Sequence, residues 1–269
     1  MAKKKKTVGL GIIGCGNISQ AYFNGAEAFE VLEVVSCADL DMKAARAKAE
    51  ENGCKAQTVK TLLANKDVDL VINLTIPAVH AEVSLAALKA GKHVHGEKPL
   101  AVTLEDGKAV LDLAKQKGLL VGCAPDTFMG AGLQTCRKVV DDGWIGRIVG
   151  GTAFMMSRGP ESWHPNPFFF YETGAGPMFD MGPYYMTALV HLLGPVKRVS
   201  AITSKAFEVR TATCKEHFGA PVPVEVPTHL SGALEFHSGA TVSVTISFDV
   251  HRHGHSPIEL YGTEGSIKI

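Results

Sequence analysis

The sequence has no excess of charge of either sign. Its 269 residues include 27 lysines and arginines and 27 aspartates and glutamates, so the formal net charge is zero. Proteins that bind nucleic acids usually present a basic surface to the phosphates, and this composition therefore predicts no nucleic-acid partner. The single basic run, Lys3–Lys6, precedes the first apolar segment, and we interpret it as a solvated tail.

Long apolar runs are also missing. No stretch approaches the roughly 20 residues that a membrane-spanning helix needs. The lysine run leads into glycine-rich sequence, whereas a secretory signal would continue into an apolar core and a cleavage site. The sequence therefore predicts a cytoplasmic protein with no membrane partner.

Paired cysteine motifs are absent. No two cysteines have CxxC or zinc-ligand spacing, so we expect reduced, mostly buried thiols at Cys15, Cys37, Cys54, Cys123, Cys136 and Cys214. Three alternating histidines, His251, His253 and His255, would share one face of a strand. Because Gly254 interrupts that strand, we interpret them as polar residues at the end of a sheet and predict no metal site.

Up to about residue 124, short apolar runs alternate with helix-favouring segments. This alternation indicates βαβ units around a parallel sheet, and therefore an α/β fold. The apolar runs include few polar residues, which is typical of strands that are covered on both faces. The expected strands are 7–13, 31–38, 69–74, 93–95 and 118–123, and the expected helices are 17–29, 42–51, 78–90 and one that begins at Thr103.

Beyond residue 124 the pattern changes. Turn signals at 237–240 and 262–265 indicate hairpins, and hence an antiparallel sheet. Residues 158–177 contain four prolines and no clear period, and a loop of this length in a compact domain is usually functional. We therefore predict two domains, 1–124 and 125–269. The expected helices of the second are 130–141 and 178–193, and its expected strands are 148–157, 196–204, 228–236, 241–250 and 258–261.

A glycine-rich loop, GCGNIS, joins the first strand to the first helix. Its first glycine permits a tight turn, its second lets a pyrophosphate approach the backbone, and the helix N-terminus attracts negative charge. Ser19 replaces the usual third glycine or alanine, and it is small enough for close packing of the helix on the sheet. A glycine turn without a ligand is the alternative interpretation. The predicted cofactor-binding residues of this loop are Gly14, Cys15, Gly16, Asn17 and Ile18.

Asp39 follows the second strand, where an acid can accept a hydrogen bond from a ribose 2′-hydroxyl. Asp41 adds a second negative charge, and both charges would repel a 2′-phosphate. Lys43 and Arg46 could offset this repulsion. We therefore expect NAD as the favoured cofactor and NADP as the alternative, with Leu40 beside Asp39 in the cofactor site.

The strand at 69–74 is followed by Thr75, Ile76 and Pro77, and His80 lies in the next helix. In a dinucleotide-binding fold the backbone at this point runs along the cofactor. We therefore predict that these four residues bind the cofactor. A helix-capping or packing role for His80 is the alternative.

Four segments occur in an order that is typical of one family: GCGNIS, TIPAVH, AGKHVHGEKPLA and GAGPMFDMGPYYMTALVHLLGPVKRV. Over nearly the whole chain they resemble the glucose–fructose oxidoreductase, inositol dehydrogenase and rhizopine-catabolism (Gfo/Idh/MocA) family. The resemblance implies a Rossmann domain followed by an α+β domain with a large open, mostly antiparallel sheet. That sheet commonly packs against its copy, so we expect a homodimer or homotetramer.

The resemblance also implies catalytic residues. In the family, the lysine of the EKP motif contacts the substrate hydroxyl near the nicotinamide; Lys98 takes that position, and both Glu97 and Lys98 join the predicted cofactor site. The aspartate of the helix motif corresponds to Asp180. Four residues further, many members have a catalytic histidine where this sequence has Tyr184, and members of the glucose–fructose oxidoreductase type use a tyrosine.

These residues suggest how a hydride could leave an alcohol carbon. Free tyrosine titrates at about 10, and a neighbouring ammonium favours the phenolate. Our hypothesis is that Tyr184 accepts the hydroxyl proton, Lys98 binds and polarises the hydroxyl, and Asp180 orients the group. A packed aromatic role is the alternative for Tyr184.

The long loop offers substrate-binding candidates. Trp163 has an apolar face for a sugar ring, and its polar neighbours can donate or accept hydrogen bonds. Histidine titrates near neutral pH, so His164 is a rival of Tyr184 as proton acceptor. The predicted substrate residues are Asp126, Thr127, Arg158, Trp163, His164 and Asn166.

The sequence is compatible with three functions. The main prediction is an NAD(P)-dependent oxidoreductase that acts on a sugar, a polyol or a related hydroxy compound. The alternatives are an NAD-dependent glycoside hydrolase and a non-catalytic regulator that binds the dinucleotide. Members of the family usually continue beyond the segment that ELYGTEGSIKI resembles, so we expect either a naturally short chain or a missing C-terminal piece.

Overall fold

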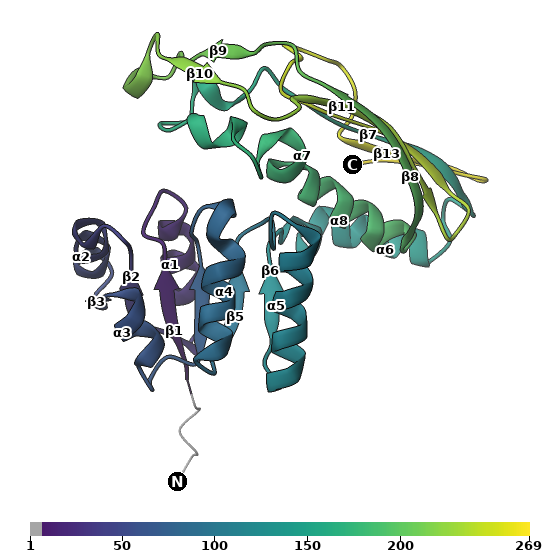
Figure 1. Ribbon diagram of the computed structural model, residues 1–269. Coiled ribbons are helices and arrows are strands. Elements are labelled where there is room, and N and C mark those ends of the chain that lie inside the picture. Colours follow the sequence, from purple (N-terminus) through teal and green to yellow (C-terminus); the bar gives the residue numbers. More distant parts are fainter. Residues whose placement is uncertain (1–6) are drawn as a thin grey trace. The chain divides into compact units, whose positions relative to one another are not determined.

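The computed structural model describes residues 7–269 and divides the chain into two compact units (Figure 1). The first unit ends at Ala124, and the second comprises Pro125–Ile269. The Lys3–Lys6 run, which we interpreted as a solvated tail, lies outside the described residues.

The first unit is built on a six-stranded sheet. The strand order is β3-β2-β1-β4-β5-β6, and each strand is parallel to its neighbours. This is the order of a Rossmann-type sheet, so the predicted parallel sheet is confirmed. The strands are β1 (Val8–Ile13), β2 (Leu32–Ala38), β3 (Lys55–Gln57), β4 (Leu70–Asn73), β5 (His93–Gly96) and β6 (Val121–Cys123).

Helices cover both faces of this sheet (Figure 1). Neighbouring residues of one strand point to opposite faces, and Ile12 and Ile13 accordingly belong to two different apolar clusters. α1 and α2 contribute to the cluster around Ile12, whereas α3, α4 and α5 contribute to the cluster around Ile13. The helices are α1 (Ser19–Glu27), α2 (Met42–Glu51), α3 (Val59–Ala64), α4 (His80–Lys89), preceded by the 3₁₀ turn η1 (Pro77–Val79), and α5 (Leu104–Lys117).

The second unit contains another six-stranded sheet, in the order β14-β13-β7-β12-β11-β8. Its neighbours are antiparallel except for β7 and β12, which are parallel. The predicted, mostly antiparallel sheet is therefore confirmed. The strands are β7 (Ile148–Met156), β8 (Val196–Ser204), β11 (His229–Phe236), β12 (Thr241–Ser247), β13 (Ile258–Gly262) and β14 (Ser266–Lys268).

One face of this second sheet is covered by helices. Leu189 and Leu192 of α8 belong to the same buried cluster as Val242 and Ile246 of β12. Thr241 and Ser243, which point to the opposite face, are exposed. The helices and 3₁₀ turns are η2 (Thr127–Met129), α6 (Ala131–Asp141), η3 (Pro160–Ser162), η4 (Phe168–Tyr171), α7 (Gly176–Asp180), α8 (Gly182–Leu193) and η5 (Lys215–His217).

A smaller sheet lies within the same unit. β9 (Val209–Thr211) and β10 (Pro221–Pro223) pair in antiparallel fashion. Val222 packs with Tyr171 and Phe248 in a separate apolar cluster. This cluster joins the small sheet to the long loop that follows β7.

Several boundaries differ from the sequence-based expectation. The helix expected over 178–193 is divided into α7 and α8 at Met181, because Pro183 has no N–H to continue the hydrogen-bond ladder. The strand expected over 241–250 ends at Ser247. β3 and α3 lie in residues 52–68, where no element was predicted.

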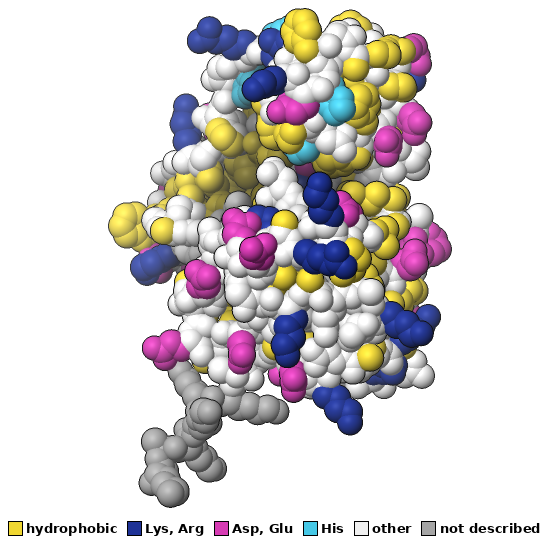
Figure 2. Space-filling view, turned by 90° about the vertical axis from the view of Figure 1, so that its left-hand side faces the viewer, with side chains coloured by type: hydrophobic (Ala, Val, Ile, Leu, Met, Phe, Trp, Pro, Cys, Tyr) yellow, Lys and Arg dark blue, Asp and Glu magenta, His cyan; other side chains and the backbone are white. Residues whose placement is uncertain are grey.

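The surface carries charges of both signs. On the face shown in Figure 2, lysine and arginine side chains are interspersed with aspartate and glutamate side chains, in agreement with the zero net charge. Within residues 7–269, none of the helices is both long and apolar enough to cross a bilayer.

Gly9 in β1 is a position where the first unit tolerates no side chain. A Cβ atom there would overlap the carbonyl oxygen of Asp67, which is backbone and cannot move aside alone. We expect Gly9→Ala to lower the free energy of unfolding by about 2 kcal/mol, a usual cost of overpacking. Urea unfolding followed by circular dichroism measures this change.

Gly25→Ala provides the matched control. Gly25 is exposed in α1, and a Cβ there would meet no atom within 4 Å. Alanine favours a helix over glycine by about 1 kcal/mol, so this variant should be as stable as the parent or more stable. Equal losses in both variants would contradict the packing argument.

Candidate functional site

The glycine loop at the end of β1 is shaped by two constraints. Gly14 has a φ of 102°, and a Cβ there would lie 2.5 Å from the carbonyl oxygen of Leu74. By contrast, a Cβ at Gly16 would meet no atom within 4 Å. The loop is therefore packed against the residues that follow β4 on one side and open at Gly16. An anion can approach the backbone there, next to the N-terminus of α1.

Asp39 links this loop to the end of β2. One carboxylate oxygen accepts a hydrogen bond from the backbone N–H of Cys15 at 2.8 Å, and the other accepts from that of Asp41 at 2.9 Å. Each carboxylate oxygen has two acceptor positions, so both can still accept from a ribose hydroxyl. Asp41 itself caps α2 through the N–H of Lys43 at 2.8 Å.

Three apolar side chains in the loops that follow β1, β2 and β4 are exposed. Leu40 is 98% exposed, Ile76 is 56% exposed and Ile18 is 47% exposed. Water is a poor environment for three apolar side chains that are close to strand ends, and a flat apolar ring would cover them. Together with the open glycine loop, these residues fit the adenosine part of a dinucleotide.

Asn73, which was not predicted from the sequence as a site residue, connects the neighbouring loops. It is fully buried at the end of β4. Its amide nitrogen donates to the carbonyl of His80 at 2.9 Å and to Ser84 Oγ at 3.1 Å. Its amide oxygen accepts from Thr75 Oγ1 at 2.7 Å and from Thr75 N–H at 3.3 Å. The side chain thereby fixes the Thr75–Pro77 turn against α4.

The buried side chain of His80 connects two loops. Its side chain is 2% exposed; Nε2 lies 2.8 Å from the carbonyl oxygen of Thr75 and Nδ1 lies 2.7 Å from that of Pro99. A ring N–H donates to a carbonyl oxygen, so the imidazole links the Thr75 turn to the EKP segment. This geometry matches the packing alternative for His80.

The EKP segment follows β5, which pairs with β4. The backbone N–H of Glu97 donates to the carbonyl of Asn73 at 2.9 Å. The Glu97 carboxylate accepts from Tyr22 Oη at 2.7 Å and from the backbone N–H of Lys98 at 3.1 Å. The Lys98–Pro99 peptide bond is cis. Lys98 lies just beyond the carboxyl end of β5, between the Glu97 contacts and Pro99, and its side chain is half-buried.

The predicted cofactor residues of the first unit thus follow four neighbouring strands, β2, β1, β4 and β5, at their carboxyl ends. Open α/β sheets bind ligands outside this edge. A cavity of about 590 Å³ lies instead near the amino ends of the strands, where Gly9, Glu33 and Asp67 line it. Because of that position, we assign the candidate site to the loops and not to this cavity.

The helical candidates of the second unit lie at the α7–α8 junction. Asp180 is the last residue of α7, Tyr184 is in the first turn of α8, and both are half-buried. Tyr185 packs against the core cluster of the second unit, and burial raises its pKa. Among the described residues, Tyr184 is not a member of any of the four core clusters.

The loop candidates form an aromatic group that we call the ledge, made of Trp163, His164, Phe169 and Phe170. The ring centroids of Trp163 and His164 lie 5.4 Å apart, and those of His164 and Phe170 lie 4.8 Å apart. Phe169 stacks on Phe170 at 4.1 Å. Trp163 is 67% exposed. The ledge therefore presents an apolar ring face to solvent.

The polar loop candidates are more dispersed. His164 Nδ1 lies 2.7 Å from the carbonyl oxygen of Asn166 and 3.0 Å from the backbone nitrogen of the same residue. Arg158 is exposed at the start of the loop, and Asp126 and Thr127 are exposed before α6. Only His164 and Asn166 of these are brought together by a direct hydrogen bond.

Metal ligands are not gathered anywhere in residues 7–269: no group of three or more histidine, cysteine, aspartate or glutamate side chains could hold an ion. His253 and His255 stack with centroids 6.0 Å apart, in a segment that is not a strand. All six cysteines are free thiols. Burial and the charge of Glu97 raise the pKa of Cys123 to about 11, so this thiol stays protonated.

Comparisons with known protein families match both units. The description "Oxidoreductase family, NAD-binding Rossmann fold" matches residues 8–124, and "GFO/IDH/MocA C-terminal domain" matches residues 133–268. Similar proteins include the levoglucosan dehydrogenase of Pseudarthrobacter phenanthrenivorans, 29% identical over 97% of this chain and 73% of its own. The 1,5-anhydro-D-fructose reductase of Ensifer adhaerens is 28% identical over 96% and 74%.

A solved structure of similar fold is that of levoglucosan dehydrogenase in complex with NADH and L-sorbose. It has a TM-score of 0.85 and 25% identity, over 97% of this chain and 72% of its own. Another similar protein is the D-glucoside 3-dehydrogenase of Escherichia coli K12, which is 30% identical over 81% of this chain and 63% of its own.

The charge of Asp39 is expected to set the preference between NAD and NADP. In Asp39→Asn the amide oxygen can still accept from Cys15 N–H, but the repulsion of a 2′-phosphate is removed. We expect the ratio of the Kd for NADPH to the Kd for NADH to fall about tenfold, or about 1.4 kcal/mol. Fluorescence titration with both cofactors measures it.

Asp41→Asn is the matched control, because it removes the same charge two residues away and leaves Asp39 intact. The cofactor preference should change much less in this variant. An unchanged ratio in Asp39→Asn, or equal changes in both variants, would rule out a specific contact of Asp39 with the ribose.

Proposed function

Since the chain belongs to the GFO/IDH/MocA oxidoreductase family, we propose that it transfers hydride between a nicotinamide cofactor and a hydroxyl-bearing carbon of a sugar or polyol. The observation that carries this proposal is the set of loops at the carboxyl edge of the first sheet, where Gly16 is open and Asp39 is fixed. The bound nicotinamide supplies the hydride acceptor or donor.

The first unit's own residues would hold the cofactor. We assign the pyrophosphate to the Gly14–Ile18 loop and the N-terminus of α1, since backbone N–H groups there suit an anion. We assign the ribose to Asp39, and the apolar side chains of Leu40 and Ile76 to the base. The Thr75–Pro77 turn is held in place by Asn73 and His80, so it would offer a rigid wall.

We assign proton transfer to Tyr184, Lys98 and Asp180. Lys98 would bind and polarise the hydroxyl, Tyr184 would accept its proton, and Asp180 would orient the group. The position of Tyr184 outside the core clusters supports this role over a packing role, whereas Tyr185 is the packed neighbour. His164 stays the rival acceptor through Nε2, because the Asn166 backbone contacts its Nδ1.

The substrate class follows from the ledge and from the similar proteins. Trp163 offers an exposed aromatic face, on which the apolar face of a sugar ring can lie. Levoglucosan dehydrogenase, 1,5-anhydro-D-fructose reductase and D-glucoside 3-dehydrogenase are named for redox chemistry on sugars. These names favour an oxidoreductase over the glycoside hydrolase and the regulator that the sequence left open.

We also propose that the exposed face of the second sheet forms a contact between copies of the chain. Ile202 of β8 is 80% exposed, and Ala233 of β11 is exposed on the face that the helices leave uncovered. Two such flat faces could pack against each other. The six free cysteines suit a reducing compartment, so a cytoplasmic location stays our prediction.

Turnover should depend on both Lys98 and Tyr184. Lys98→Ala removes the cation and Tyr184→Phe removes only the hydroxyl, and loss of a general acid–base group costs about 10²- to 10⁴-fold in rate. We therefore expect kcat to fall by at least 100-fold in each variant, with the Kd for NADH unchanged. Absorbance of NADH and NADPH, over a panel of sugars, inositols, polyols and their keto forms, measures turnover.

Tyr185→Phe is the matched control, because it removes a hydroxyl from the neighbouring, packed tyrosine. It should retain the parent kcat. Full activity of Tyr184→Phe would exclude Tyr184 as proton acceptor and would favour His164 in that role. A parent protein that binds NADH yet converts no substrate of the panel would argue for the hydrolase or the regulator.

A further inference from the structure

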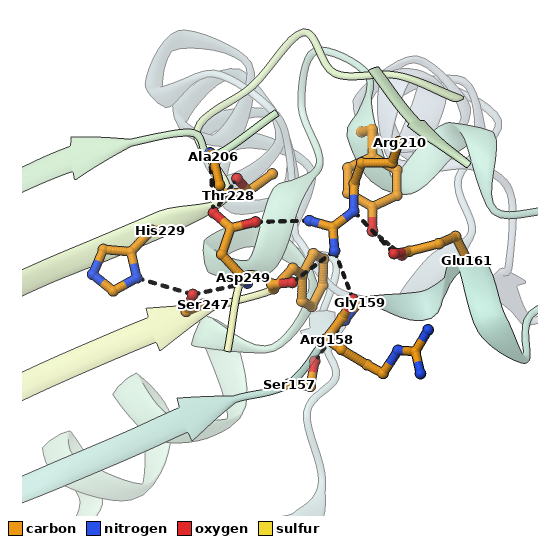
Figure 3. Close-up of polar contacts among 12 residues, drawn as sticks. Ser157, Arg158, Gly159, Glu161, Ala206, Arg210, Thr228, His229, Ser247 and Asp249 are labelled. Carbon is orange, nitrogen blue, oxygen red and sulfur yellow. Dashed lines mark hydrogen bonds and ion pairs between the residues drawn. The ribbon is translucent and has the colours of Figure 1, made fainter. Parts of the chain in front are cut away.

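A buried cluster of charged residues lies under the long loop of the second unit (Figure 3). Its centre is Arg210 of β9, whose side chain is 9% exposed. The guanidinium Nε donates to Glu161 Oε1 at 2.9 Å, and Nη1 donates to Asp249 Oδ1 at 2.7 Å. Both carboxylates are as buried as the arginine. None of these three residues was predicted from the sequence as a site residue.

The second terminal nitrogen of Arg210 reaches the backbone. Nη2 donates to the carbonyl of Arg158 at 2.6 Å and to that of Phe248 at 3.0 Å. The guanidinium carbon also lies 5.4 Å from the centroid of the Tyr171 ring. Arg210 thus contacts the first residue of the long loop, its first 3₁₀ turn and the end of its second.

Hydroxyl groups complete the cluster. Tyr171 Oη donates to the second oxygen of Glu161, and Thr228 Oγ1 donates to the second oxygen of Asp249 at 2.6 Å. Tyr171 is fully buried, and burial together with the nearby Glu161 raises the pKa of its phenol. The phenol therefore remains a donor to the carboxylate.

Gly159 shows how closely these groups approach the loop backbone. Its φ of 96° favours glycine, and a Cβ there would overlap both Glu161 Oε2 and Tyr171 Oη. The loop can take this path only because position 159 has no side chain.

The contacts attach the loop at both ends of the ledge. Arg158 and Glu161 precede Trp163, and Tyr171 follows Phe170, so the exposed ring lies between two anchored points. The intervening chain has only short 3₁₀ turns, which cannot define its position by themselves. The planar guanidinium of an arginine fixes both the direction and the distance of its hydrogen-bond partners. An apolar contact, in contrast, lets the two packed groups slide past each other.

We infer that Arg210 is a positioning residue: through Glu161, Tyr171 and the Arg158 carbonyl it holds the ledge in a preformed arrangement that receives the sugar ring of the substrate. The inference rests on the proposed function, because that proposal assigns the ledge to the substrate. A preformed surface saves the cost of ordering a loop when the ligand binds. Arg210 would therefore affect substrate affinity without touching the substrate.

Arg210→Met tests this inference, because it keeps the length of the side chain and removes the fork. The protein has two tryptophans, so a Trp144→Phe background makes Trp163 the only fluorophore of its kind. We expect lower fluorescence anisotropy of Trp163 without any ligand, a KM for the sugar at least tenfold higher, and a Kd for NADH within twofold of the parent. In Arg210→Lys, the Trp163 anisotropy and the KM should lie between the values of the parent and those of Arg210→Met.

Arg137→Met is the matched control. Arg137 in α6 also bonds a carboxylate, that of Asp141, and a backbone carbonyl, that of His191, but it does not contact the loop anchors. Its anisotropy and KM should equal those of the parent. If Arg210→Met does not fold by circular dichroism, Tyr171→Phe removes only the phenol donor and should shift both quantities in the same direction by a smaller factor.

The two readouts separate this inference from the proposed function. Parent values of both the Trp163 anisotropy and the KM in a folded Arg210→Met would overturn the positioning role. Lower anisotropy with an unchanged KM would overturn the link between ledge and substrate, although Arg210 would still order the loop. If no sugar is converted by the parent, the proposed function fails, and unchanged anisotropy would separately overturn the positioning role.

Discussion

A buried amide, that of Asn73, determines the arrangement of the loops at the carboxyl edge of the first sheet. An asparagine side chain has two donors and two acceptor positions, and here all four are used, by His80, Ser84 and the Thr75 backbone and hydroxyl. The backbone carbonyl of Asn73 also receives the N–H of Glu97. Because an unsatisfied buried polar group is costly, the turn after β4, the start of α4 and the EKP segment are fixed relative to one another.

Much of the fold could be predicted from the sequence, where a long apolar or helix-favouring run has clear ends. The bounds of Met42–Glu51 and Val196–Ser204 agree with α2 and β8, and Thr103 caps α5 through the N–H of Asp106. β3 and β9 have three residues each. Segments this short show no period, and they form because neighbouring strands supply their hydrogen bonds.

The same distinction applies to the site. The glycine loop and the acid after β2 obey local rules, so they could be proposed from sequence alone. Asn73 and Arg210 could not, since their importance lies in partners that the fold brings close. Arg210 is 49 residues from Glu161 and 39 from Asp249 in the sequence, and an arginine in a short strand is normally taken as a solvated side chain.

The place of β7 in the second sheet has a consequence for synthesis on the ribosome. β7 lies between β12 and β13, and its pairing partners begin at Thr241 and Ile258, long after β7 itself has left the exit tunnel. Closing so large a loop is slow. Until those residues have been made, both edges of β7 lack partners, and unpaired edges can join strands of other chains. The first unit, whose strands pair over shorter distances, can fold during this interval.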